Sequence, residues 1–146
     1  MFTLMMTVSS QRLHILKILK RQGLSVEMLH NVFYAIIVSK IAYAISSWHS
    51  FLTKAQIAQI NSLFKRAYKY GYVKLIITAE ELLANYDDHL FHKASYDNHC
   101  LHHLLPIVKS TNYVLRDVGY GLLLDHTITE LHKRTFINRM LFRNCC

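Results

Sequence analysis

The stretch that decides the fold runs from Val26 to Ser46 and reads VEMLHNVFYAIIVSKIAYAIS. Its apolar side chains leave the expected helix apolar nearly all round, which is typical of a helix buried at the centre of a domain. The most apolar part, Val32 to Ile45, spans about 14 residues and contains Lys40, whereas a membrane-spanning helix needs about 20 apolar residues. We therefore expect a central core helix and no membrane partner.

Helix signals on both sides of this stretch predict two neighbouring helices. Ser9 and Ser10 can cap a helix over about 11–22, which Gly23 is placed to end, and Ser25 can cap the central helix. Thr53 and Gln56 form a capping box that opens a third helix, which ends near Gly71. The N-terminal part should therefore contain three helices.

The second half of the chain shows one long helical pattern and then loses its regularity. Thr78 and Glu81 form another capping box, and apolar residues follow at helical spacing through Phe91. The pattern breaks up from Ser95 to Asp125, and Thr127 or Thr129 is placed to cap a last helix that runs through Phe142. We expect an all-α helical bundle of three N-terminal helices plus a further long helix, with an irregular C-terminal segment.

The composition agrees with this fold class. The 146 residues include only 4 Gly and 1 Pro, and 52% are hydrophobic. Strands and tight turns consume Gly and Pro, so few connections are expected, and no Gly-rich phosphate-binding loop can be built. The length fits one domain, which excludes a large multidomain enzyme.

The charge is concentrated in the first half of the chain. Residues 1–74 carry ten Lys and Arg against the single acid Glu27, and residues 75–146 carry seven against eight acids. We expect 1–74 to form a basic helical part and 75–146 a helical and irregular tail, packed together as one domain. A basic half suggests a polyanionic partner such as nucleic acid, although a basic surface also serves solubility alone.

The three cysteines and the N-terminus predict an intracellular protein. Cys100, Cys145 and Cys146 are odd in number, and the apolar start, Met1 to Met6, lacks the basic region of a secretory signal. Reduced thiols in the cytoplasm or nucleus are the simpler interpretation.

Two basic stripes form the best functional signal. Basic side chains recur at helical spacing in the first and third expected helices, opposite or beside their apolar stripes. The candidate contacts to a nucleic-acid backbone are His14, Lys17, Lys20, Arg21, Lys54, Lys65, Arg66 and Lys69. The alternative for any such charge run is a solvated helix face.

The order of several short motifs resembles the C-terminal part of LINE-type (non-LTR) retrotransposon reverse transcriptases. The first group resembles the segment after the catalytic palm and includes Gln11-Arg12-Leu13, Leu19-Lys20-Arg21, Gly23-Leu24, Tyr43-Ala44 and Leu63-Phe64-Lys65-Arg66-Ala67. The second group resembles a segment near the end of such polyproteins and includes His99 to Pro106, Leu115-Arg116, Gly119-Tyr120 and Phe136 to Phe142. Met1 to Val8 departs from the family's preceding segment, and the fingers and palm are not in the chain.

This resemblance implies the helical thumb and tail of an RNA-directed DNA polymerase, whose thumb helices lie along the template–primer duplex. It implies Mg²⁺ as the cofactor of the parent enzyme and the missing fingers and palm as partners. The chain itself is then expected to be a non-catalytic fragment that holds nucleic acid and needs no cofactor.

Tyr86-Asp87-Asp88 resembles a polymerase signature only superficially. Polymerase palms carry an aromatic-x-Asp-Asp turn, because paired carboxylates hold two metal ions for phosphoryl transfer. Here Asn85 stands at the aromatic position, and the pattern is that of an amphipathic helix. We expect a solvated helix face and no catalytic residues in this chain.

The His/Cys group His99, Cys100, His102 and His103 is a weak candidate for half of a zinc site. Structural zinc takes four N or S ligands in paired spacings, and the adjacent Cys145-Cys146 are poorly spaced for one tetrahedral ion. Polar turn residues around Pro106 are the simpler interpretation, and no metal site is predicted.

The sequence therefore supports two alternative functions. One is a reverse transcriptase fragment that grips the phosphate backbone, and the alternative is a helical protein-interaction module whose charge serves solubility only. Salt dependence separates them, because binding through phosphate contacts weakens steeply as salt rises.

Overall fold

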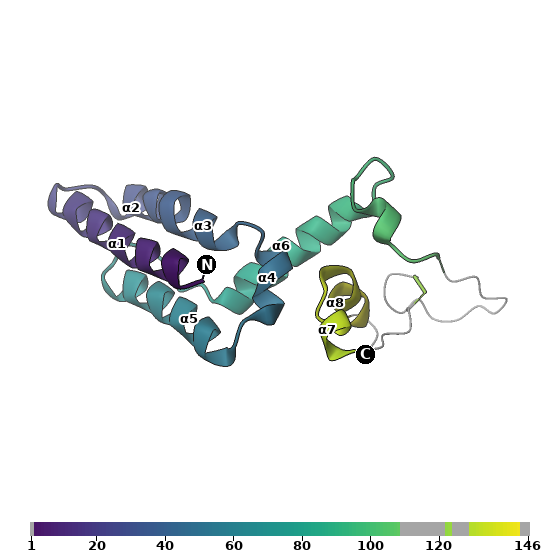
Figure 1. Ribbon diagram of the computed structural model, residues 1–146. Coiled ribbons are helices and arrows are strands. Elements are labelled where there is room, and N and C mark those ends of the chain that lie inside the picture. Colours follow the sequence, from purple (N-terminus) through teal and green to yellow (C-terminus); the bar gives the residue numbers. More distant parts are fainter. Residues whose placement is uncertain (1, 109–121, 124–128, 144–146) are drawn as a thin grey trace. The chain divides into compact units, whose positions relative to one another are not determined.

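The chain is all-α in the part that the structure describes. A computed structural model describes residues 2–108, 122–123 and 129–143, and within these ranges the only β-type pairing is one isolated bridge between Val108 and Leu122. The helical elements, shown in Figure 1, are α1 (Phe2–Arg21), α2 (Val26–Phe33), η1 (Tyr34–Val38), α3 (Ser39–Ala42), α4 (Ile45–Trp48), η2 (His49–Phe51), α5 (Lys54–Lys69), α6 (Ala79–Ala94), η3 (His102–Leu104), α7 (Glu130–Lys133) and α8 (Phe136–Arg143).

The chain divides into two compact units. The first unit comprises residues 1–45 and 52–84, and the second comprises 46–51 and 85–146. The division falls inside α6 and does not coincide with the change of charge after Lys74, which separates the two parts expected within one domain. That charge-based boundary stays a prediction.

The core of the first unit is built from α1, from the segment α2–η1–α3 and from α5. Phe33, Ile37 and Ile41 have no exposed surface, which confirms the expected burial of the central apolar stretch. Phe33 packs edge-on against Phe64 of α5, with ring centroids 6.2 Å apart. Leu16 of α1 is also fully buried, so all three helices contribute to one core.

The central stretch is not one continuous α-helix. Tyr34–Val38 forms a π-helical turn in which the N–H of Ser39 donates to the carbonyl of Tyr34, and Arg12 of α1 donates to the carbonyl of Ile36 in this turn. The last helical piece, α3, then ends at Ala42, and Ala44 beyond it has a φ of +52°. A side chain inserted beside the backbone ladder and a left-handed residue are established causes of such breaks.

Both glycine-ended helices close with the same backbone motif. Gly23 has φ +90°, its N–H donates to the carbonyl of Lys20, and the N–H of Leu24 donates to that of Leu19. Gly71 has φ +67° and ends α5 in the same way. These are Schellman motifs, in which glycine takes the left-handed position at little steric cost.

The start of α1 differs from expectation. The helix begins at Phe2 and not near Gln11, so Ser9 and Ser10 lie inside it and do not cap it. Ser9 is in fact buried against the core. The turns before Gln11, which were not predicted, lengthen two rows of side chains on the surface of α1.

The other predicted caps are confirmed. Ser25 caps α2, and Thr53 with Gln56 forms the capping box of α5. At the start of α6, Thr78 and Glu81 exchange hydrogen bonds of 3.1 and 3.2 Å. Thr129 caps α7, while the expected last helix is split into α7 and α8; Thr127 lies outside the described residues.

The second unit has a small apolar core of its own. Phe91 of α6 packs with Met140 and Leu141 of α8, and half-buried apolar residues surround these three. The rings of Phe91 and Phe136 lie 6.4 Å apart. The expected long fourth helix thus continues into this unit as α6.

The segment Val26–Phe51 passes a length and composition test for a membrane-crossing helix. Its most apolar window has a mean hydropathy of 1.5, and 39% of that window is buried inside the protein. Core helices and signal sequences pass the same test. Its residues 26–45 contribute to the core of the first unit, and the lack of a membrane partner stays a prediction.

Candidate nucleic-acid interface

All eight basic side chains selected from the sequence are exposed, and all belong to the first unit. His14, Lys17, Lys20 and Arg21 lie on α1, and the other four lie on α5. None of the eight pairs with a carboxylate among the described residues. Their charge is therefore available to an outside partner.

A shallow groove runs between α1 and α5. It has a volume of about 580 Å³, and its lining consists mainly of hydroxyl and amide side chains: Thr3, Met6, Thr7, Ser10, Gln11 and Gln59. Such side chains are common partners of phosphate oxygens in protein–nucleic acid complexes. The groove exists because α1 begins at Phe2.

The groove continues into part of the basic surface. Along α1, the residues Thr3, Thr7, Ser10, His14, Lys17 and Arg21 follow one another in steps of four and three. Steps of this size keep side chains on one face of a helix, so the groove-lining hydroxyls and the three basic side chains form one polar row. On α5, Arg66 lies seven residues after Gln59 and so shares its face.

The structure does not bring every predicted residue to this groove. Successive residues of an α-helix are rotated by about 100° around its axis. Lys54, Lys65 and Lys69 therefore lie between roughly a quarter and somewhat more than a third of a turn around α5 from Gln59. They form an outer basic row on α5, beside the groove wall and not in it. The polar row of α1 and the outer row of α5 are therefore separate strips on the first unit.

Lys20 has a structural partner within the chain. Its Nζ donates to the carbonyl of Tyr70 at 2.6 Å and lies 5.8 Å from the centroid of the Tyr72 ring. The ammonium thereby closes the last turn of α5, where a cation is favoured by the helix dipole. Lys20 is consequently the weakest of the eight as a contact to an outside phosphate.

Aromatic side chains adjoin the basic end of α5. Tyr70 is exposed, Tyr72 is buried, and their ring centroids lie 5.8 Å apart. Burial raises the pKa of Tyr72, the neighbouring Tyr70 adds to this rise, and Arg21 opposes it. Tyr72 is thus a buried packing residue whose ring lies near the ammonium of Lys20.

The single acid of residues 1–74 is neutralised. Glu27 accepts a hydrogen bond of 2.7 Å from Nζ of Lys74, and both side chains are exposed. This hydrogen bond and the charge of Lys74 hold the pKa of Glu27 below its ordinary value. Glu27 stays ionised and paired at neutral pH and does not repel an anion near the basic rows.

Asp87 is not part of a solvated helix face, and that expectation was wrong. It is 2% exposed, and its carboxylate accepts from Nε and Nη2 of Arg139 at 2.8–3.1 Å. Arg139 also donates to the carbonyl of Ser46 at 2.9 Å and to the hydroxyl of Ser50. Asp88 is exposed and pairs with Arg143 at 3.2 Å. The two carboxylates therefore have basic partners within the second unit.

The His/Cys group does not converge. Among the described residues, no three His, Cys, Asp or Glu side chains lie close enough to hold a metal ion. Nδ1 of His99 accepts from the N–H of Leu101 at 3.2 Å, while Nδ1 of His102 lies 3.2 Å from the carbonyl oxygen of Ala94. Cys100 and His103 are exposed, and Cys145 and Cys146 lie outside the described residues.

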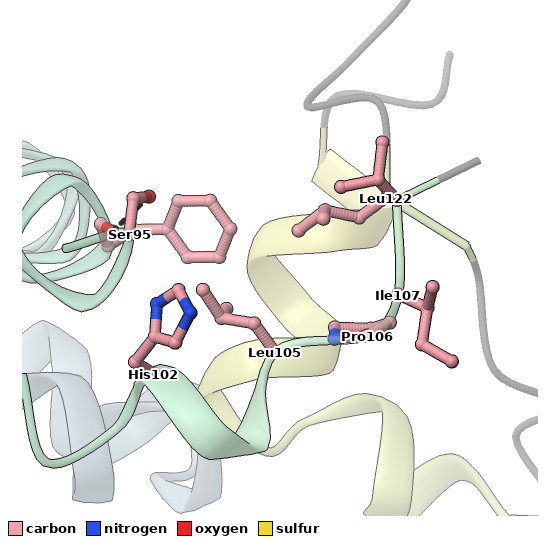
Figure 2. Close-up of a pocket in the computed structure, with 8 residues that line it drawn as sticks. Ser95, His102, Leu105, Pro106, Ile107 and Leu122 are labelled. Atoms are coloured by element: carbon pink, nitrogen blue, oxygen red, sulfur yellow. Dashed lines mark hydrogen bonds between the residues drawn. The ribbon is translucent and has the colours of Figure 1, made fainter. Parts of the chain in front are cut away.

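A second cavity lies in the second unit and is mostly apolar. It has a volume of about 470 Å³, and Figure 2 shows Ser95 and His102 among Leu105, Pro106, Ile107 and Leu122 at its wall. The Ser95 hydroxyl donates to the carbonyl of Phe91 at 3.1 Å. Both polar side chains thus already have local hydrogen-bond partners in the described part of the chain.

Comparison with protein-family models, with curated proteins and with solved structures gives no match. A function of this chain is therefore proposed from its residues and their arrangement.

Proposed function

We propose that the first unit binds nucleic acid through its phosphate backbone and that the chain is a non-catalytic part of a non-LTR retrotransposon reverse transcriptase. The observation that carries the proposal is the exposure of all eight basic side chains on two neighbouring helices, with no carboxylate paired to them in the described residues. The family assignment comes from the order of the sequence motifs.

The polar row supports backbone contact and not base reading. Phosphate contacts from Arg, Lys, Ser, Thr and Gln position a protein on a duplex without carrying sequence information. Thr7, Ser10, Lys17 and Arg21 offer these groups along one face of α1. Lys65 and Lys69 add charge on α5. We therefore expect binding that tolerates any sequence.

The test is fluorescence anisotropy with two labelled RNA–DNA duplexes of unrelated sequence. The full chain should bind both with similar affinity. The variant Lys17→Gln, Arg21→Gln, Lys65→Gln, Lys69→Gln should bind both more weakly while keeping its helix content by circular dichroism. Equal binding by the variant and the parent would favour the alternative, in which the charge serves solubility alone.

We propose no polymerase activity for this chain alone. Phosphoryl transfer needs carboxylates that hold two metal ions, and the resembled parent enzyme supplies these from its palm with Mg²⁺. The paired Asp87 and exposed Asp88 do not replace them. Mg²⁺-dependent primer extension by the purified chain that is lost in Asp88→Asn would refute this.

A further inference from the structure

We propose that α1 carries a docking surface for an acidic amphipathic helix of a protein partner. The surface is an apolar row formed by Leu4, Val8, Gln11, Ile15 and Ile18, which follow one another in steps of four and three. This is the a/d spacing by which helices pair in coiled coils. Docking of this partner does not require the proposed binding of nucleic acid, although both use the basic side chains of His14 and Arg21.

The apolar row is not part of the core of the first unit. The face of α1 that packs inward carries the buried residues Ser9, Leu13 and Leu16. In contrast, Leu4 is 69% exposed, Ile15 48% and Ile18 43%. Exposure of apolar side chains at this spacing to water costs free energy, and a partner that covers them removes this cost.

The geometry fits one helix of two to three heptads. At 1.5 Å per residue, the row from Leu4 to Ile18 is about 21 Å long. From Thr3 to Lys17, each residue of the polar row directly precedes a residue of the apolar row, which is a rotation of about 100° around the helix axis. The two rows therefore occupy adjacent faces of α1. Gln11 interrupts the apolar row at its middle and also lines the groove, so the two faces of α1 meet at this residue.

The charged side chains beside the row indicate the chemistry of the partner. Residues 2–21 contain no acid, and His14 and Arg21 flank the row on the side of the groove. A second copy of α1 placed on the row would bring Arg21 and the other Lys and Arg side chains of α1 close to the same side chains of the first copy, which is destabilising. A helix with Glu at its flanking positions would pair with them, so we assign the surface to an acidic helix.

The experiment uses the full chain and three labelled helical peptides of 21 residues as probes, a length of about three heptads. The first peptide has Leu and Ile at a and d and Glu at e and g. The second replaces Glu by Lys, and the third keeps Glu but has Gln at a and d. Only the first should bind in an anisotropy titration at physiological salt.

Matched variants assign the binding to the row. Ile15→Gln with Ile18→Gln should weaken binding of the first peptide by about tenfold or more, because two apolar contacts are lost. Leu75→Gln with Ile76→Gln makes the same chemical change at exposed positions outside α1 and should change affinity less than about twofold.

Four results would overturn the proposal. These are no binding of the first peptide, equal binding of the second or third, equal loss in both double variants, and concentration-dependent dimerisation abolished by Ile15→Gln with Ile18→Gln. The last would identify a second copy as the occupant. None of these results involves nucleic acid, so they do not test the proposed binding of nucleic acid, which is tested separately.

Discussion

Arg139 and Asp87 lie 52 positions apart in the sequence, yet their side chains meet inside the second unit with Nη2 and Oδ2 2.8 Å apart. The guanidinium also reaches the Ser46 carbonyl, so one side chain ties α8 to α6 and to the start of the 46–51 segment. A bidentate pair of this kind is directional as well as strong. Removing one partner leaves a buried charge without compensation.

Arg139→Ala should therefore lower the free energy of unfolding by about 3–5 kcal/mol. Arg143→Ala is the matched control, because it breaks the exposed pair with Asp88 and should cost less than about 1 kcal/mol. Urea denaturation of the full chain measures both. Equal losses in the two variants would show that Asp87 is not a buried partner.

The sequence could not reveal this pair. Asp87 was assigned to a solvated helix face because it lies in the sequence pattern of an amphipathic helix and Asn85 stands where a polymerase turn has an aromatic residue. The basic side chain that compensates the buried carboxylate lies on α8, and no spacing between neighbouring residues in the sequence indicates it. By contrast, the role of Thr53 could be predicted, because a capping box is formed by residues three apart.

Among the elements, α1 and α5 owe their ends to glycines in the left-handed region. At Gly23, an added Cβ would meet no atom within 4 Å, so a substitution there tests backbone conformation alone. Gly23→Ala should cost roughly 1–2 kcal/mol, the penalty for a left-handed L-residue.

The measurement is again urea denaturation, with Gln22→Ala as the control at the preceding position, where an ordinary helical conformation suffices. Gly23→Asn should lose less than Gly23→Ala, because asparagine tolerates this conformation better. An unchanged stability of Gly23→Ala would mean that α1 does not end in the Schellman motif.

Element boundaries could be predicted where the signal is local and not where tertiary contacts decide. The caps at Ser25, Thr53, Thr78 and Thr129 follow from residues a few positions apart. The π turn at Tyr34–Val38 could not be predicted, because Arg12 from another helix contacts it. The early start of α1 was missed because two serines resembled a cap.

For the whole molecule, the all-α class followed from scarce Gly and Pro and from helical periodicity. The division into two units did not, because composition changes after Lys74 while the packing changes inside α6. The candidate interface was predictable as a set of residues. Its arrangement into a polar row and an outer row was not, since the groove depends on the added turns of α1.

The stability of the first unit should depend on Phe33, which is enclosed by α1, by α5 and by the segment α2–η1–α3 that contains it. Phe33→Ala should cost about 3–5 kcal/mol, enough to unfold a marginally stable domain. Tyr68→Ala removes an aromatic ring that is 45% exposed and should change stability by less than about 0.5 kcal/mol. Similar melting temperatures for the parent and Phe33→Ala would contradict the position of the central stretch in the core.

The central claim is that the basic rows of α1 and α5 contact phosphates, and the salt dependence of duplex binding tests it most directly. Each phosphate contact contributes about 0.9 to the log–log slope of affinity against salt on B-DNA. The variant with Lys17, Arg21, Lys65 and Lys69 replaced by Gln should therefore flatten the slope by roughly 3–4 units. A control with Lys93, Lys133, Arg134 and Arg143 replaced by Gln removes the same charge from the second unit and should leave the slope nearly unchanged. An equal slope for the parent and the α1/α5 variant, or equal flattening by both variants, would contradict the claim.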